Sequence, residues 1–295
     1  MSLRRRIASS PAVVAAVNGR ARTGEDELRA AIAGKTVVVT GASYGIGEAT
    51  ARRLARAGAT VVIVARTAER LEELAGELGP HAHPYACDLP DEAAVGDLAL
   101  RLLFEHGPPD VLVNNAGKSI RRSIADSTDR FHDFQRTIGV NYLGPVQLTL
   151  ALLPAMRERR AGHLVNISTS GVRGLPPSPG WSAYQASKAA FDVWSRCVAQ
   201  EVRPDGVAST SIYFGLVRTR MSAPNFATIP GMSPEDAAAL VCDAIVRRPR
   251  TAGPSWVGLA DVITSGLMRG TTERVMTRAF VRNERARAAR REREA

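Results

Sequence analysis

The sequence predicts a single doubly wound α/β domain, in which helices cover both faces of a parallel sheet. Short runs of β-branched and other apolar residues alternate along the chain with longer stretches of helical periodicity. The strand-like runs are apolar almost throughout, as in strands that are buried on both faces. A repeated strand–helix alternation of this kind is typical of parallel sheets. No internal repeat divides the chain, and 295 residues fit one large domain with extensions.

The elements follow one another without a long gap. Strands are expected at 37–39, 60–65, 82–87, 111–113, 163–168 and 207–213. Helices are expected at 45–57, from 67 onward, and at 91–106, 129–159, 182–202 and 234–246. Pro145 falls inside the longest helical stretch, where we expect a kink or local irregularity because proline removes a backbone hydrogen bond.

The two ends of the chain carry most of its net charge of +10. Residues 1–34 hold six arginines against three acids, and residues 267–295 hold nine arginines against four glutamates. We therefore predict an N-terminal extension over 1–34, a central domain over 35–250 and a helical, arginine-rich extension over 251–295.

Composition limits the kinds of binding partner that we expect and the cell compartment in which we expect the protein. The basic ends hold few aromatic residues on which bases could stack, so nucleic acid is not expected as a partner. Arginine and glutamate interleave at helical distances, which favours a solvated tail, with contact to an anionic membrane surface or a partner as the alternative. No run reaches the roughly 18 apolar residues of a membrane span.

Three cysteines without paired spacing indicate free thiols, and we expect a cytoplasmic protein, peripheral membrane association being the alternative. The five histidines lack ligand spacing, and no metal site is expected.

A glycine-rich segment lies between the first expected strand and the first expected helix. Glycines there permit a tight turn and a close approach of backbone to a pyrophosphate. The free N–H groups and the dipole of the following helix favour the negative charge of that group. The segment therefore predicts a dinucleotide site. Its expected binding residues are Gly41, Ser43, Tyr44, Gly45, Ile46 and Gly47.

The glycine spacing is G-x3-G-x-G, which resembles the TGxxxGIG element of the short-chain dehydrogenase/reductase family. Further motifs of that family occur in the same order: Asp88, Asn114–Gly117, Asn141 and Tyr184–Lys188. The resemblance covers roughly 35–250. It implies a Rossmann-type catalytic domain that transfers a hydride between a nicotinamide cofactor and a carbonyl or alcohol carbon.

The family pattern assigns roles to several of these residues. By resemblance, Asp88 binds the adenine edge with Leu89 beside it. Asn114, Ala116 and Gly117 form the wall near the adenosine ribose.

The end of the second strand bears on cofactor choice. An acidic residue there would bind the ribose hydroxyls and repel a 2′-phosphate. This chain has Ala65 and Arg66, with Arg70 one turn later. A guanidinium suits a phosphate by its charge and its forked donors, and Ser43 could add a hydroxyl. We predict NADP(H) in preference to NAD(H).

Tyr184 and Lys188 are the predicted catalytic pair. Four residues apart on a helix, they share one face. A free phenol has a pKa near 10, and a neighbouring ammonium lowers it toward a usable acid–base range. In the resembling family the lysine also holds the nicotinamide ribose, and an asparagine, matched here by Asn141, links the lysine to a water chain.

The hydroxyl that orients the substrate oxygen departs from the family pattern. The family places a serine three residues after the asparagine of its fifth strand. Asn166 plus three is Thr169, which we choose, with Ser168 and Ser170 as the alternatives.

After the sixth strand, the sequence resembles the family's PGxVxT segment, with Phe214 in place of the proline. By resemblance, Val217 and Thr219 belong to a segment that contacts the nicotinamide, and the Val217 backbone binds its carboxamide. By resemblance, 214–232 also includes a substrate lid. Its largely apolar sequence favours an apolar substrate, and packing of these residues onto the core regardless of substrate is the alternative.

The predicted function is that of an NADP(H)-dependent oxidoreductase acting on an apolar aldehyde, ketone or acyl thioester. Local sequence is most similar to the acyl-CoA reductase or long-chain carbonyl reductase branch. Resemblance also implies a homodimer or homotetramer. The alternative is a catalytically silent NADP(H)-binding regulatory or membrane-surface protein, which the intact Tyr184, Lys188 and Asn141 set disfavours.

Overall fold

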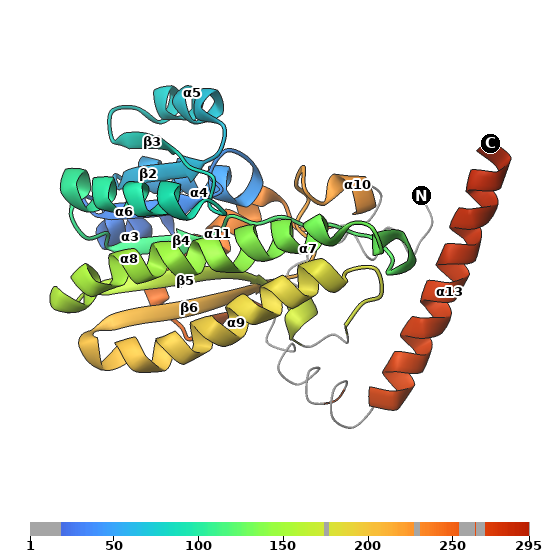
Figure 1. The fold of residues 1–295 in the computed structure, drawn as a ribbon. Coiled ribbons are helices and arrows are strands. Elements are labelled where there is room, and N and C mark those ends of the chain that lie inside the picture. The colour runs from blue at the N-terminus through green and yellow to red at the C-terminus, as the bar shows by residue number, and fades with distance from the viewer. Residues whose placement is uncertain (1–18, 174–176, 227–230, 254–262, 264–268, 295) are drawn as a thin grey trace.

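Seven parallel strands form one sheet in the computed structural model, in the order β3-β2-β1-β4-β5-β6-β7 (Figure 1). The structure describes residues 19–173, 177–226, 231–253, 263 and 269–294. The predicted doubly wound parallel fold is confirmed. The strands are β1 (Thr36–Thr40), β2 (Thr60–Ala65), β3 (Ala82–Ala86), β4 (Val111–Asn114), β5 (Gly162–Thr169), β6 (Val207–Phe214) and β7 (Thr251–Ala252).

Helices connect the strands and cover both faces of the sheet (Figure 1). The α-helices are α3 (Glu25–Ile32), α4 (Gly45–Arg56), α5 (Ala68–Leu78), α6 (Glu92–His106), α7 (Phe131–Ile138), α8 (Gly144–Glu158), α9 (Ser182–Val202), α10 (Ala223–Phe226), α11 (Pro234–Arg247) and α13 (Arg269–Glu294). Short helical turns are η1 (Ala125–Ser127), η2 (Gly139–Leu143), η3 (Ser170–Val172) and η4 (Arg203–Asp205).

Local signals set where several helices begin and end. The Asp91 carboxylate accepts a hydrogen bond from Ala94 N at the start of α6, at 3.1 Å. Ser233 caps α11 in the same way, and Pro234 follows in the first turn, where a missing N–H costs nothing. Gly107 ends α6 at a φ of +70°, a backbone conformation that side chains disfavour.

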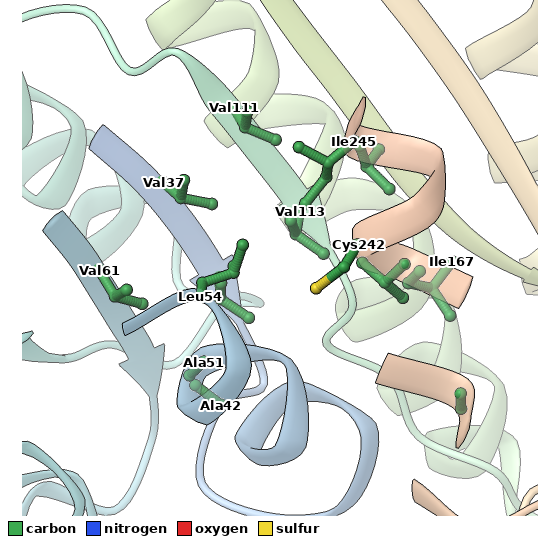
Figure 2. Packing of buried hydrophobic residues seen from close by; sticks show 14 of the residues in the cluster. Val37, Ala42, Ala51, Leu54, Val61, Val111, Val113, Ile167, Cys242 and Ile245 are labelled. Atoms are coloured by element: carbon green, nitrogen blue, oxygen red, sulfur yellow. The ribbon is translucent and has the colours of Figure 1, made fainter. Parts of the chain in front are cut away.

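Two apolar layers sandwich the sheet because side chains alternate along each strand. Val37 and Val39 of β1 belong to the layer that α4 and α11 cover, together with Leu54 and Cys242. Figure 2 shows Val37, Leu54 and Cys242 in this layer. Val38 faces the other layer, formed with α6, α8 and α9. Since both faces of the central strands are buried, their continuous apolar runs are explained.

The longest helical stretch is interrupted, as predicted, but just before Pro145. A π-helical turn, η2, separates α7 from α8, and Pro145 sits in the first turn of α8. π-Turns of this kind are frequent at functional sites, and this one carries Asn141. A second proline, Pro154, lies within α8 without ending it.

By length and composition, the stretch Phe131–Glu158 in the described part of the chain could also cross a membrane. Of its most apolar 18-residue window, 44% is buried within the structure. Leu148 and Leu152 of this stretch pack into the apolar layer that α6 also covers. A helix in the core of a folded domain can be equally long and equally apolar, so these two criteria do not distinguish it from a membrane span.

The ends of the predicted domain differ from expectation in detail. Helix α3 lies inside the predicted N-terminal extension, yet Leu28 and Ile32 belong to the core. The Asp243 carboxylate of α11 accepts hydrogen bonds from the backbone of Arg22 and Thr23. Strand β7 was not predicted; it pairs with β6 and carries the sheet past residue 250.

The arginine-rich tail forms the helix α13, as predicted, and it stands beside the body of the molecule in Figure 1. Its side chains Val275 and Val281 are exposed. Parts of three predicted segments lie outside the described residues: 1–18 of the N-terminal extension, 227–230 of the lid, and 254–262 with 264–268 before the tail helix.

The packing of α6 gives a test of this architecture. Leu102 is 1% exposed in the core, whereas Leu100 on the same helix is 69% exposed. We expect Leu102→Ala to lower the free energy of unfolding by about 2–5 kcal/mol, through lost burial and a residual cavity. Leu100→Ala should change it by no more than about 0.5 kcal/mol. Urea unfolding followed by circular dichroism measures both, and equal costs would contradict the placement of α6.

Candidate active site

Three glycines shape the turn between β1 and α4. Gly41 and Gly45 have φ angles of +65° and +62°, in the left-handed region that favours glycine. A Cβ on Gly41 would lie 2.7 Å from the Ala116 Cα, and one on Gly47 would overlap the Gly41 carbonyl oxygen. The turn is therefore closed to side chains, and it lies at the N-terminus of α4, where helix backbone N–H groups can bind a pyrophosphate. The residues present fit a dinucleotide.

A second loop, after β4, is bonded to this turn. Asn115 Nδ2 donates to the Thr40 and Gly41 carbonyl oxygens, at 2.9 and 3.2 Å. The Thr40 hydroxyl accepts from the backbone N–H groups of Asn115 and Ala116, both at 3.0 Å. These bonds lock together the carboxyl ends of β1 and β4, where strand order reverses and where dinucleotides bind in such folds.

The side chain of Asn114 does not join this wall, contrary to the prediction from resemblance. It is buried beneath α8, and its Nδ2 donates to Thr149 Oγ1 at 3.2 Å and Asn166 Oδ1 at 3.0 Å. Because side chains alternate along β4, Asn114 shares the face of Leu112, and Asn115 faces the cleft. That alternation is the signal that could have distinguished the two asparagines.

One cleft of about 1530 Å³ runs along the carboxyl edge of the sheet. Most of the predicted site residues line it, whereas Gly45, Gly47, Asn114 and Asn141 lie behind its wall. The predicted residues on its surface are Gly41, Ser43, Tyr44, Ile46, Arg66, Asp88, Leu89, Ala116, Gly117, Thr169, Tyr184, Lys188, Val217 and Thr219.

At the β2 end of the cleft, two arginines have different surroundings. The Arg70 guanidinium is paired within the protein, because it donates hydrogen bonds to the carboxylates of Glu48 and Glu73, at 2.8 and 3.0 Å. The Arg66 side chain is 68% exposed at the mouth, with its Nε 3.7 Å from Asp88. Arg66 is thus the guanidinium of this pair that a ligand can reach.

Tyr184 and Lys188 lie together near the middle of the cleft. Lys188 is buried, and its ammonium donates to the Ile167 carbonyl oxygen of β5 at 2.9 Å. Burial lowers the pKa of Lys188 to about 8, because desolvation disfavours the charged form. Contrary to the expectation that Lys188 lowers it, the pKa of the Tyr184 phenol is raised by burial, and a hydrogen bond with the Thr169 side chain opposes that rise.

Of the three candidate hydroxyls, Thr169 is the one whose side chain bonds Tyr184. All three residues line the cleft. The Ser168 hydroxyl is buried without a hydrogen-bond partner in the described structure, and Ser170 lies within the turn η3. The choice of Thr169 for the substrate oxygen stays a prediction.

Asn141 reaches the pair indirectly. Its Oδ1 accepts from Lys118 N at 2.7 Å, and its Nδ2 donates to Lys118 O and Ser187 Oγ, both at 2.8 Å. Ser187 in turn donates to the Tyr184 carbonyl oxygen at 2.7 Å. Asn141 therefore fixes the backbone around the pair. Gly117 leaves the space between Asn141 and Lys188 open, since a Cβ there would lie 3.4 Å from Asn141 Oδ1 and 3.6 Å from Lys188 Nζ.

Aromatic contacts that sequence reasoning missed close the substrate end of the cleft. The Trp181 ring stacks on Phe226 of α10, with centroids 5.6 Å apart, and meets Tyr184 edge-on at 6.0 Å. Across the cleft, the Arg220 guanidinium lies 4.9 Å from the Tyr44 ring. Two residues after β6, Arg220 and Phe226, thus contact aromatic side chains that line the cleft.

These features define a class of protein, and comparison with known proteins places the chain in it. A model of the short chain dehydrogenase family matches residues 35–230. The chain belongs to the short-chain dehydrogenase/reductase family of oxidoreductases.

Two curated relatives are similar to this chain over most of its length. An uncharacterized oxidoreductase of Mycobacterium tuberculosis is 44% identical over 90% of this chain and 77% of its own length. A fatty acyl-CoA reductase of Acinetobacter baylyi is 47% identical over 76% of this chain and 77% of its own.

Solved structures of two relatives contain nicotinamide cofactors. A Brucella melitensis 3-ketoacyl-(acyl-carrier-protein) reductase, complexed with NADH, is 29% identical with a TM-score of 0.67, over 75% of this chain and 96% of its own. A metagenomic short-chain oxidoreductase in complex with NADP is 34% identical with a TM-score of 0.64, over 74% and 93%. A nicotinamide cofactor is therefore supported. Within the described residues, no cluster of His, Cys, Asp and Glu could hold a metal ion.

The glycine turn gives the test of the cofactor site. We expect Gly47→Ala to weaken NADPH binding at least tenfold, because the new methyl group overlaps the Gly41 carbonyl and pushes the turn apart. Gly96→Ala is the matched control: Gly96 lies in α6 with nothing near its Cβ position, and alanine favours a helix. Fluorescence titration with NADPH measures both. Unchanged affinity in Gly47→Ala would contradict the site.

Proposed function

We propose that this protein is an NADP(H)-dependent reductase of apolar carbonyl compounds, with Tyr184 as the general acid. The observation that carries the proposal is the placement of Tyr184 and the buried Lys188 ammonium in one cleft, with the Thr169 hydroxyl bonded to the phenol. General acid catalysis requires a proton donor within hydrogen-bond reach of the reacting oxygen.

The residues divide the work of reduction. Burial keeps the Tyr184 phenol protonated, ready to give its proton to the carbonyl oxygen. Thr169 donates a hydrogen bond to the same oxygen and fixes its position. When bound, the reduced cofactor supplies the hydride that the carbonyl carbon accepts. An aldehyde or ketone becomes an alcohol; a thioester adduct expels its thiol and leaves an aldehyde.

Lys188 stabilises the phenolate that Tyr184 leaves behind. A positive charge in a desolvated site has a far stronger effect than in water. The ammonium donates a hydrogen bond to the neutral Ile167 carbonyl oxygen, and it forms no ion pair with an acidic side chain among the described residues. The nearby phenolate would be its first negative partner.

NADP(H) is favoured over NAD(H) by charge at the end of β2. Arg66 is exposed at the mouth of the cleft beside Ala65, where an NAD-preferring site would carry an acid. Asp88 is the sole acid among the described residues that line the cleft.

An apolar substrate is favoured by the aromatic end of the cleft. Trp181 and Phe226 present apolar surface beside Tyr184, and a curated relative is a fatty acyl-CoA reductase. A long-chain aldehyde, ketone or acyl thioester fits these features.

A homo-oligomer in the cytoplasm remains part of the proposal. A shallow apolar hollow on the outer face of α9 supports it, lined by Tyr142, Ala189, Ala190, Val193, Trp194 and Cys197. Peripheral membrane contact through the arginine-rich ends remains the alternative location.

Removing the phenol hydroxyl tests the assignment of Tyr184. Tyr184→Phe should lower kcat for aldehyde reduction by about 10²- to 10⁴-fold, the usual range for a general acid, while the NADPH Kd stays within about twofold. Tyr142→Phe is the control, because Tyr142 lines the outer hollow and not the cleft. Retained turnover in Tyr184→Phe would sink the mechanism. Tight NADPH binding without turnover of any carbonyl by the unmodified protein would instead favour a silent, regulatory role.

The pKa of Lys188 predicts the pH dependence. Lys188 is protonated below its pKa of about 8, so kcat/KM for reduction should be highest below pH 8 and fall as pH rises through that value. The free-enzyme profile of kcat/KM between pH 6 and 10 shows this directly. A profile that stays flat to pH 10 would contradict the role of a desolvated ammonium.

Charge reversal tests cofactor choice. Arg66→Glu should raise the Kd of NADPH at least tenfold while that of NADH changes little, because only NADPH carries the 2′-phosphate. Arg56→Glu makes the same charge change on an exposed residue of α4 away from the cleft. If both variants shift NADPH binding equally, Arg66 does not set the preference.

A further inference from the structure

Two cationic side chains line the cleft on the side formed by α7 and the loop after β4. They are Lys118, which is half-buried, and Arg136, which is exposed. Neither side chain has a hydrogen-bond or ion-pair partner in the part of the chain that the structure describes. Two arginines nearby in the sequence do have an ion-pair partner: Arg122 and Arg130 both pair with the buried Asp133, at 2.8 and 3.3 Å.

The position of these cations is fixed by the catalytic framework. Asn141 bonds both backbone groups of Lys118, and Arg136 lies on α7, which leads directly into the turn that carries Asn141. Lys118 also follows Gly117, whose Cβ position lies 3.6 Å from Lys188 Nζ. Both cations therefore lie on the wall of the cleft formed by α7 and the loop after β4.

The bound cofactor does not account for these charges. Its pyrophosphate would bind at the glycine turn, where Arg220 lies over Tyr44. Arg66 lies at the β2 end of the cleft, where a 2′-phosphate would bind. Lys118 and Arg136 belong to different elements.

Another wall of the substrate end is aromatic. Trp181 and Phe226 stack there, and the Arg121 guanidinium lies 5.8 Å from the Trp181 ring. No carboxylate lines this end of the cleft among the described residues. The substrate end thus combines an apolar wall with a cationic one.

We propose that the substrate is an anionic amphiphile: its apolar chain lies along Trp181 and Phe226, and an oxyanion distant from the reacting carbon binds Lys118 and Arg136. Guanidinium and ammonium groups bind phosphate and carboxylate by charge-assisted hydrogen bonds. The oxyanion is a phosphate of a thioester carrier or a carboxylate on the chain. This inference rests on the proposed carbonyl reductase activity.

Two matched pairs of substrates separate the sources of charge. Palmitoyl-CoA is compared with the neutral N-acetylcysteamine thioester of palmitate, and 16-oxohexadecanoate is compared with hexadecanal. For each pair, the ratio of kcat/KM for the anionic member over the neutral one is measured with NADPH. We expect a ratio of at least ten in one pair; the first pair reports phosphate and the second carboxylate.

The same ratio of kcat/KM values, measured in variants, shows which residues bind the oxyanion. Arg136→Gln and Lys118→Gln should each lower it about tenfold, the usual effect of losing one charged hydrogen bond. Arg136→Lys should keep most of it, because the charge remains. Raising the ionic strength should also lower the ratio. The controls are Arg29→Gln on α3 and Lys35→Gln before β1, both outside the cleft; they should keep the unmodified ratio.

Three outcomes decide the proposal. Ratios near one in both pairs would overturn it while leaving the carbonyl reductase activity in place. A high ratio that neither Arg136→Gln nor Lys118→Gln lowers would overturn the assignment of the oxyanion to this wall. If none of the four compounds is turned over, the proposed function fails and the inference fails with it.

Discussion

The buried ammonium of Lys188 is the constraint on which the arrangement of the site depends. A cation removed from water is costly unless polar groups replace its hydration. Here the Ile167 carbonyl at the end of β5 accepts a hydrogen bond from it. Asn141 fixes the neighbouring backbone by its hydrogen bonds to Lys118. The cost of this burial appears as a pKa of about 8. Burial also raises the pKa of the Tyr184 phenol, one helical turn away.

The fold supplies that environment from elements far apart in sequence. Strand β5 provides the carbonyl, α9 provides the tyrosine and lysine, and the π-turn η2 provides the asparagine. Within η2, Asn141 bonds the backbone of Lys118 in the loop after β4. The irregular turn thus carries a residue of the site, as π-turns frequently do.

Sequence alone predicted much of this structure because its strongest signals are local. The parallel sheet follows from continuous apolar strands, and the cofactor turn follows from glycines between a strand and a helix. Tyr184 and Lys188 follow from helical spacing. Signals that depend on tertiary placement were missed or misassigned. Asn114 was placed at the cleft, although strand alternation buries it under α8. Strand β7 has two residues, too few for a pattern. The stacking of Trp181 on Phe226 joins segments with no local relation.

The central claim is that Lys188 is a desolvated ammonium that titrates near pH 8. The sequence contains three lysines, Lys35, Lys118 and Lys188. Labelling lysine with ¹³C at Cε therefore gives three resonances, and Lys188→Met identifies the one that belongs to Lys188. The account predicts that this resonance titrates with a midpoint near pH 8 in the cofactor-free protein. A midpoint at the ordinary lysine value, above pH 10, would contradict it.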